Sequence, residues 1–364
     1  MKVLHIINGE YYAGAEKVQD LLALGLTELG HEISFVCFKP DKFPSLRTGQ
    51  EISLHKMPMR HRFDFGCARR VAALVRDGGF KLLHSHSPRG AMIGRVASLL
   101  AGVPMVHHVH SPAARDTEAP LMNRVNSVVE RWSAGSIQAL IPVSRSLERY
   151  LVQQGFSAER IFTVPNGVPT PGPLPGRSSP QGTWHIGTVA LFRPRKGIEI
   201  LLRAASLLLR SGRDLRIVAV GGFETPAYET EIKALAHNLG LDGHVIWTGF
   251  TRDVDTALRG LDVMVLPSLY GEGMPMAVLE AMATGVPVVA SDVEGIPEVL
   301  EHGRTGLVVP SGNEQALAAE LGALMDGRHD WTRIRQDAYR LQCERYSSRS
   351  MARAVSDVYA QVLS

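Results

Sequence analysis

The sequence has few cysteines and no long apolar run. Its 364 residues include only 3 cysteines, which are widely spaced and form no C-x-x-C pair: Cys37, Cys67 and Cys343. This argues against both a disulfide framework and a cysteine-ligated zinc site, and favours a reducing compartment. No apolar stretch approaches the roughly 18 residues of a membrane-spanning helix, and polar Asn8-Gly9-Glu10 interrupts the N-terminus too early for a signal peptide. We therefore expect a cytoplasmic protein that is neither exported nor integral to a membrane.

The net charge is small but unevenly distributed. A formal charge of +3 conceals 20 Lys and Arg against 14 Asp and Glu in residues 1–168. There is no basic helix with interleaved aromatic residues, so we expect no nucleic-acid partner. The positive charge has two possible interpretations. It is either a solvated helix face, or a patch that contacts an anionic partner, namely lipid headgroups or a lipid-linked acceptor. Much of it lies in Arg60, Arg62, Arg69, Arg70 and Arg76.

Short β-branched runs alternate with helical patterns in both halves of the chain, which is typical of parallel sheets wrapped by helices. A chain this long favours two cores over one. We therefore predict an α/β protein of two facing, Rossmann-like doubly wound domains with a cleft between them. The expected strands are residues 3–7, 33–38, 81–84, 104–109 and 139–143, then 184–190, 215–220, 245–248, 263–266 and 286–290.

A stretch rich in Pro, Gly and Ser separates the two halves. Its composition suits neither a helix nor a central strand, so we place a linker at residues 169–182 between domains at 1–168 and 183–345. Apolar residues recur at helical spacing from Met351 to Val362, which predicts a final amphipathic helix within about 346–364.

The segment from Pro267 to Ala283 carries the strongest chemical signal. It follows an expected strand, Gly273 frees the turn, and Pro275 suits the first turn of the next helix. Unpaired N–H groups and the helix dipole at that start make an anion site that fits a diphosphate. Glu272 precedes the helix, and Glu280 lies roughly 7 to 8 Å along its axis. The two carboxylates therefore flank the phosphate position, or else they are solvated surface groups.

Glu272 and Glu280, with seven residues between them, match the paired-glutamate motif of the retaining family 4 glycosyltransferases. The flanking residues also resemble that family, at 280–291, 295–298 and 303–309. The resemblance covers essentially the whole chain. It implies the GT-B fold, with an acceptor-side N-terminal domain, a donor-binding C-terminal domain and a last helix that packs back on the N-terminal domain.

The resemblance also implies the cations that hold the donor diphosphate. The loop Val189-Ala-Leu-Phe-Arg-Pro-Arg-Lys-Gly197 places Lys196 where the family has its lysine, but Leu191 stands at the usual arginine position. Arg193 or Arg195 then supplies the guanidinium. The implied donor-binding set is completed by the turn and helix start, namely Gly273, Met274, Pro275 and Met276.

Two N-terminal segments resemble further family motifs. Ala13-Gly14-Ala15-Glu16 is similar to a Gly-Gly-Ala-Glu loop, which brings the Gly14 backbone near the donor phosphates or the acceptor. His110 aligns with the family histidine that binds the transferred sugar. The strand period puts His108 and His110 on one face and His107 on the other. With His84 and His86 nearby in sheet order, a metal cluster is an alternative to cleft-lining or core histidines, although no H-E-x-x-H motif is present.

The implied activity is transfer of a hexosyl unit from a UDP- or GDP-linked sugar to a hydroxyl, in polysaccharide or lipid-linked glycan synthesis. His110, Glu272, Lys196 and Arg193 would be the catalytic residues, with no cofactor or metal, and the enzyme would be peripheral at the cytoplasmic membrane face. Three alternatives stay open: an NDP-sugar epimerase of the same fold, a sugar phosphorylase, and a sugar-nucleotide-binding protein without turnover.

Overall fold

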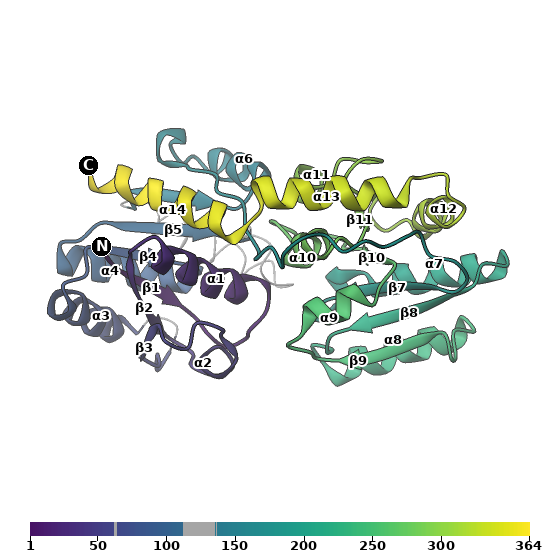
Figure 1. The fold of residues 1–364 in the computed structure, drawn as a ribbon. Helices are drawn as coiled ribbons and strands as arrows, with labels where there is room; N and C mark the ends of the chain where they lie inside the picture. Colours follow the sequence, from purple (N-terminus) through teal and green to yellow (C-terminus); the bar gives the residue numbers. More distant parts are fainter. Residues whose placement is uncertain (62–63, 112–134, 136) are drawn as a thin grey trace. The chain divides into compact units, whose positions relative to one another are not determined.

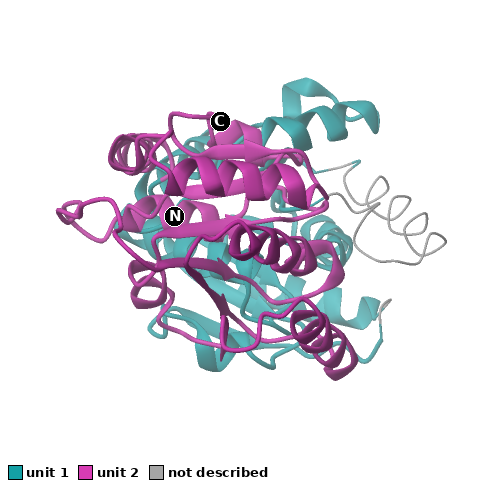
Figure 2. Cartoon of the chain, turned by 90° about the vertical axis from the view of Figure 1, so that its right-hand side faces the viewer, with its two compact units in different colours: residues 1–169, 347–364 teal, residues 170–346 magenta. Residues whose placement is uncertain are grey.

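A computed structural model describes residues 1–364 except 62–63, 112–134 and 136, so Arg62 lies outside the described residues. The chain forms two compact units, one of residues 1–169 with 347–364 and one of residues 170–346 (Figure 2). None of the described helices is long and apolar enough to cross a membrane.

Unit 1 is built on a six-stranded parallel sheet in the order β3-β2-β1-β4-β5-β6 (Figure 1). The strand order reverses between β1 and β4, and open α/β sheets bind ligands at the carboxyl ends of strands at such a switch point. The strands are β1 (Lys2–Ile7), β2 (Glu32–Cys37), β3 (Ser53–Lys56), β4 (Leu82–Ser85), β5 (Met105–Val109) and β6 (Ala139–Pro142).

Two unit 1 helices, α3 and α4, begin and end at residues suited to those positions. The Asp64 side chain accepts a hydrogen bond from the Cys67 N–H at the start of α3, and Gly79 ends that helix with a φ of +66°. Ser87 caps α4 in the same way. The described helices are α1 (Gly14–Glu28), α2 (Phe43–Leu46), α3 (Phe65–Gly78), α4 (Pro88–Ala101), α6 (Arg145–Gln153) and α14 (Ser348–Leu363).

Unit 2 repeats this architecture, with a parallel sheet in the order β12-β11-β10-β7-β8-β9. Its switch point lies between β7 and β10. The strands are β7 (Trp184–Val189), β8 (Leu215–Val220), β9 (Val245–Gly249), β10 (Val263–Leu266), β11 (Val288–Ser291) and β12 (Leu307–Val309). The helices are α7 (Ile198–Arg210), α8 (Pro226–Asn238), α9 (Val254–Arg259), α10 (Met276–Thr284), α11 (Ile296–Val299), α12 (Glu314–Met325) and α13 (Trp331–Arg345).

Each strand expected from the sequence is present with its ends within two residues, and the prediction of two parallel α/β sheets is confirmed. Strands β3 and β12 were missed. The four residues of β3 are half-buried or exposed, and the three of β12 are too few to display a period. Strand β11 begins at Val288 rather than Val286, after Pro287, which has no N–H to donate to a ladder.

The segment expected to link the domains is bound to unit 2 over part of its length. Arg335 of α13 donates to the carbonyls of Gly285 and Pro175, both at 3.0 Å, and its guanidinium lies 5.2 Å from the Trp331 ring centroid. Arg177 also pairs with Asp262, the residue directly before β10. Residues 170–182 thus belong to unit 2, whereas α14, after them in sequence, belongs to unit 1.

Candidate functional site

The first group of predicted site residues lies where β7 and β10 end, on either side of the unit 2 switch point. The loops after these strands are joined, because the Leu269 N–H donates to the Arg195 carbonyl at 2.8 Å. Gly197 has a φ of +63°, and a Cβ there would lie 2.1 Å from the Pro267 carbonyl oxygen. Only glycine permits this approach, and it brings the basic loop beside the loop that carries Glu272.

A buried ion pair forms the centre of this site. Lys196 Nζ pairs with Glu272 Oε1, and the two side chains are only 16% and 5% exposed. Ser268 Oγ donates to the same carboxylate oxygen at 2.6 Å, and Arg195 Nη1 lies 3.9 Å from it. Burial lowers the pKa of Lys196, and the Glu272 carboxylate opposes that shift. The site therefore holds its cation in place with a fixed counter-charge.

The two candidate arginines lie differently. Arg195 Nη1 donates to the Gly271 carbonyl at 2.9 Å, which fixes its guanidinium against the Glu272 loop. Arg193 instead pairs with Glu224, with Nη2 and Oε1 3.2 Å apart. The structure thus brings Lys196 and Arg195 together around Glu272, and it gives Arg193 a separate carboxylate partner.

Glu294 is also part of this site, although it was not among the residues predicted from the sequence. Its carboxylate accepts a hydrogen bond from the Glu272 N–H at 2.8 Å, while the Gly295 N–H donates to the Glu272 carbonyl at 2.9 Å. Among the described residues it alone, apart from glycines, has a positive φ, of 39°. Such a conformation costs about 1 to 2 kcal/mol and persists only where surrounding contacts hold it. The signal in the sequence was an acidic residue directly before Gly295.

The helix expected to receive a diphosphate begins one residue later than predicted. Pro275 takes the N-cap position with extended backbone, φ −75° and ψ 119°, so it precedes the first turn of α10 instead of lying in it. A proline side chain offers no capping oxygen, which leaves the first amides of α10 available to an anion. Glu280 lies half-buried in the second turn, and Met274 and Met276 are buried.

Unit 1 holds the other predicted residues at the carboxyl edge of its sheet. Gly14 is the first residue of α1 and is exposed. His110 follows β5 directly and is half-buried. His108 and His110 stack with centroids 4.6 Å apart, while His107 Nδ1 lies 2.9 Å from Ser85 Oγ on the opposite face. The predicted alternation of these three rings is confirmed.

The stacked rings belong to a larger buried cluster at the unit 1 switch point. His84 and His86 stack on each other at 4.1 Å and on His108 at 5.4 and 5.5 Å. His5 of β1 and Tyr359 of α14 complete it, with His84 Nδ1 2.6 Å from the Tyr359 hydroxyl. Neither residue was predicted from the sequence to belong to a site, because their contacts with each other and with His84 join residues far apart in the chain.

Burial keeps these imidazoles neutral. It lowers the pKa of His5 and His110 to about 3, and neighbouring histidines add to the effect. The pKa values of His84, His86 and His108 also fall well below the ordinary value for the same reasons. Two triads have ring nitrogens within 4.8 Å of one another, His5-His84-His86 and His86-His108-His110, which is close enough for the metal alternative to require a test.

Comparisons with known proteins agree with this architecture. Residues 176–341 match the family model "Glycosyl transferases group 1", and residues 13–167 match "Glycosyl transferase 4-like domain". The chain is 30% identical over 313 residues to a phosphatidyl-myo-inositol mannosyltransferase of Mycobacterium leprae, covering 83% of this chain and 79% of that one. It is 31% identical over 324 residues to an MMP alpha-(1->4)-mannosyltransferase of Mycolicibacterium hassiacum, covering 84% and 76%.

Solved structures share the fold over the full length. Anabaena Alr3699/HepE in complex with UDP-glucose superposes with a TM-score of 0.86 at 21% identity, covering 99% of this chain and 100% of that one. A sucrose-phosphate synthase from Thermosynechococcus elongatus gives 0.82 at 19% identity, covering 100% and 99%. With two six-stranded parallel sheets of the GT-B type, the chain belongs to the group 1 (family 4) glycosyl transferases and is a retaining, nucleotide-sugar-dependent hexosyltransferase.

Proposed function

We propose that the donor diphosphate binds unit 2 where β7 and β10 end, against Lys196, Arg195 and the first amides of α10. The observation that carries this proposal is the buried Lys196–Glu272 pair, with Arg195 beside it. A lysine that remains charged in a nearly buried setting is a preorganised partner for phosphate oxygens. Because Glu272 pairs with Lys196, the buried ammonium group has a counter-charge even without ligand. The Lys196 side chain is already largely desolvated, so binding of the diphosphate does not require it to lose much more water.

The two glutamates have distinct roles in this proposal. Glu272, fixed by Ser268 and by the Glu294 contact to its backbone, orients hydroxyls of the transferred sugar. Glu280, in the second turn of α10, accepts hydrogen bonds from the ribose. Family resemblance assigns Gly14 to the donor phosphates and His110 to the transferred sugar. Arg193, paired with Glu224, adds positive charge near Lys196 without touching Glu272.

The chemistry is a front-face displacement that retains the anomeric configuration. The bond from C1 to the diphosphate oxygen breaks as the acceptor oxygen bonds to C1 on the same face, and the departing phosphate oxygen accepts the acceptor's proton. Hydrogen bonds from Lys196, Arg195 and the first amides of α10 stabilise the diphosphate, so transfer should continue in a chelator. A glycosyl-enzyme adduct trapped on a side chain, or activity lost to EDTA and restored by a divalent cation, would refute this mechanism.

The donor is a UDP- or GDP-linked hexose, and the acceptor belongs to a polysaccharide or lipid-linked glycan. The similar mannosyltransferase of Mycobacterium leprae, named for phosphatidyl-myo-inositol, supports a lipid-linked acceptor. The HepE structure with UDP-glucose supports uridine. An epimerase would interconvert free NDP-sugars, whereas a transferase consumes them only with an acceptor.

Calorimetric titration of UDP, GDP, ADP and UMP into the protein and into Glu280→Ala tests the donor site. We expect tight binding of one diphosphate, weaker binding of UMP, and loss of at least tenfold affinity in the variant. UDP-glucose and GDP-mannose would then be offered with candidate acceptors. No binding of any diphosphate would overturn the proposed donor site.

We also propose that a face of unit 1 contacts anionic membrane lipid. Helices α3 and α4 pack side by side, and exposed apolar residues lie on them beside exposed arginines. Phe65, Leu99 and Leu100 are 46%, 67% and 49% exposed. The Arg76 guanidinium donates to the Leu100 carbonyl at 3.0 Å, which joins the two helices at this surface. Exposed apolar groups on the same two helices as exposed arginines suit an interface of acyl chains and phosphate headgroups.

Vesicle flotation tests this surface. The protein should float with vesicles containing anionic phospholipid and remain in solution with neutral phosphatidylcholine. Replacing both Leu99 and Leu100 by Ser should reduce flotation at least fivefold without changing diphosphate binding, because both side chains are exposed and lie in unit 1. Equal flotation on both vesicle types, or no effect of the double variant, would contradict the proposal.

A further inference from the structure

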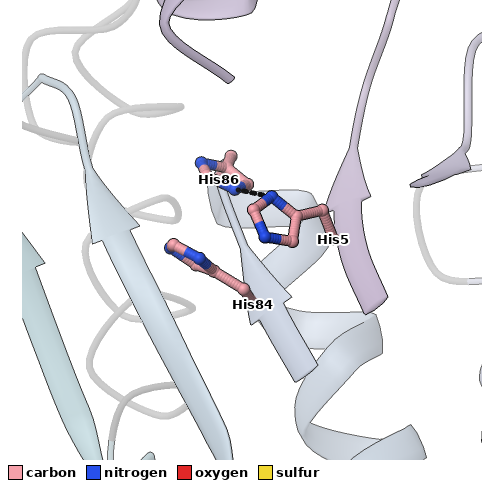
Figure 3. A group of neighbouring side chains, drawn as sticks. All are labelled: His5, His84 and His86. Carbon is pink, nitrogen blue, oxygen red and sulfur yellow. Dashed lines mark hydrogen bonds between the residues drawn. The ribbon is translucent and has the colours of Figure 1, made fainter. Parts of the chain in front are cut away.

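A row of hydrogen-bonded side chains leads inward from His110. Its Nε2 lies 3.4 Å from His86 Nδ1, and His86 Nε2 lies 3.1 Å from His5 Nδ1. Figure 3 shows the His86 and His5 rings meeting edge to edge, with His84 beside them. His5 Nε2 is 3.2 Å from the Tyr359 hydroxyl, which lies 2.6 Å from His84 Nδ1. Four histidines and one tyrosine are thus connected in series.

If every contact of the row is a hydrogen bond and the phenol donates to one neighbour while it accepts from the other, the series has two proton arrangements. Each neutral imidazole has one N–H and one lone pair, and a phenol donates one proton while accepting another. Once one ring's proton is placed, every other ring must follow. In one arrangement all four histidines carry the proton on Nδ1, and in the other all four carry it on Nε2.

The two ends of the row decide between these arrangements. His84 Nε2 and His110 Nδ1 are both buried and have no hydrogen-bond partner among the described residues. A buried N–H without an acceptor is rarer and costlier than a bare lone pair. His84 is completely buried, whereas His110 is half-buried at the sheet edge. Either arrangement therefore leaves one buried N–H without an acceptor in the described protein. The Nδ1 arrangement leaves only a lone pair at the completely buried His84 and places the terminal N–H on His110, the end of the row at the sheet edge, which an acceptor from outside the protein can approach.

We propose that His86, His5 and Tyr359 are positioning residues that hold His110 in the Nδ1–H form, so that it donates a hydrogen bond to a hydroxyl oxygen of the transferred sugar. The role assigned to His110 rests on the proposed function, but the proton arrangement of the row does not. Helix α14 takes part in the row, because the Tyr359 hydroxyl is the hydrogen-bonding link between His5 and His84.

The competing hypothesis is that His5, His84 and His86 bind a metal ion, because their ring nitrogens lie within 4.8 Å of one another. Metal-bound imidazoles usually donate their second N–H to a carboxylate, a backbone carbonyl or water. Here the second nitrogens of His5 and His84 face a phenol, and that of His86 faces another imidazole. Ligation would also break the contact between His5 and His86. The row makes a hydrogen bond of each of its four contacts, whereas ligation by His5, His84 and His86 would break one of them.

Long-range proton–nitrogen correlation spectra of ¹⁵N-histidine-labelled protein read the tautomer of each ring without any substrate. Signals are assigned with single His→Gln variants. We expect Nδ1–H forms for all four histidines of the row at pH 7.5. Nε2–H forms, protonated imidazolium rings, or a stoichiometric transition metal found by elemental analysis would each overturn the proposal.

Two substitutions of His86 separate positioning from packing. In His86→Gln the carboxamide can accept from His5 and donate to His110, whereas His86→Phe fills the space and can do neither. We expect kcat to fall about tenfold in His86→Phe, equivalent to about 1.4 kcal/mol, and to stay within about twofold of wild type in His86→Gln. Diphosphate affinity should be unchanged in both, because the cations proposed to hold the diphosphate, Lys196 and Arg195, lie in unit 2, whereas His86 lies in unit 1.

Equal kcat values in the two His86 variants and wild type would refute the positioning role. If His86→Phe does not fold, Tyr359→Phe interrupts the same row with a ring that fits α14, and it should lower kcat with diphosphate affinity unchanged. Failure of the wild-type protein to bind a diphosphate or transfer a sugar would instead refute the proposed function, while the tautomer spectra would still test the row.

Discussion

Mild acid should weaken unit 1 because its buried histidines resist protonation. Burial lowers the pKa of His5 to about 3 and of His107 to about 4, whereas both return to about 6.5 in the unfolded chain. Between these values the unfolded chain binds more protons, so stability is fully present above pH 6.5 and is lost as the pH falls toward the folded pKa. The His5 and His107 side chains are 0% and 4% exposed, so solvent does little to reduce the cost of protonating them in the folded protein.

The expected loss is large compared with ordinary stability. At pH 5.5, one unit below the unfolded pKa, each of His5 and His107 costs about 1.4 kcal/mol, or about 3 kcal/mol together. The lowered pKa values of His84, His86 and His108 act in the same direction. Domains of this size are stable by only about 5 to 15 kcal/mol. Unit 1 should therefore open at much lower urea concentration at pH 5.5 than at pH 7.5.

Urea unfolding followed by circular dichroism measures this effect, and limited proteolysis with mass spectrometry identifies the unit that opens. His107→Gln removes one titrating ring and should shrink the loss between pH 7.5 and 5.5 by about 1.4 kcal/mol. Val71→Ala, a buried change without a titrating group, should lower stability equally at both pH values. An unfolding free energy that is the same at pH 7.5 and 5.5 would refute the reasoning.

Three further predictions concern unit 2. Glu272→Gln should reduce transfer at least 100-fold and cost about 3 kcal/mol, since it leaves Lys196 charged and nearly buried; adding Lys196→Met should recover the stability but not the activity. Gly295→Ala places a Cβ 1.9 Å from the Gly273 carbonyl oxygen, so melting temperature and diphosphate affinity should both fall, and unchanged calorimetric binding would contradict this. Arg335→Met leaves three carbonyl acceptors without their donor and should destabilise unit 2 by about 2 kcal/mol in urea, with diphosphate affinity intact.

Local patterns were sufficient to predict the architecture. Alternating β-branched runs and helical periods predicted the two parallel sheets, since both periods are properties of neighbouring residues. The loop after β10 was predicted for the same reason, because a strand, a glycine turn and a proline before a helix are contiguous in sequence. The start of helix α10 was predicted one residue too early, because a proline suits both the N-cap and the first turn.

Only the tertiary structure decided which distant residues meet. In the folded protein Lys196 pairs with Glu272, whereas Arg193 pairs with Glu224. The Glu294 carboxylate accepts a hydrogen bond from the Glu272 backbone N–H. The fold also joins His5 to Tyr359, which lie 354 residues apart. Contacts of this kind depend on strand order and on where α14 packs. A single buried histidine leaves no periodic pattern in the sequence from which its partners could be predicted. The sequence by itself determined the sheets and the loops at their edges, while the ionisation and partners of the site residues followed from burial and long-range packing.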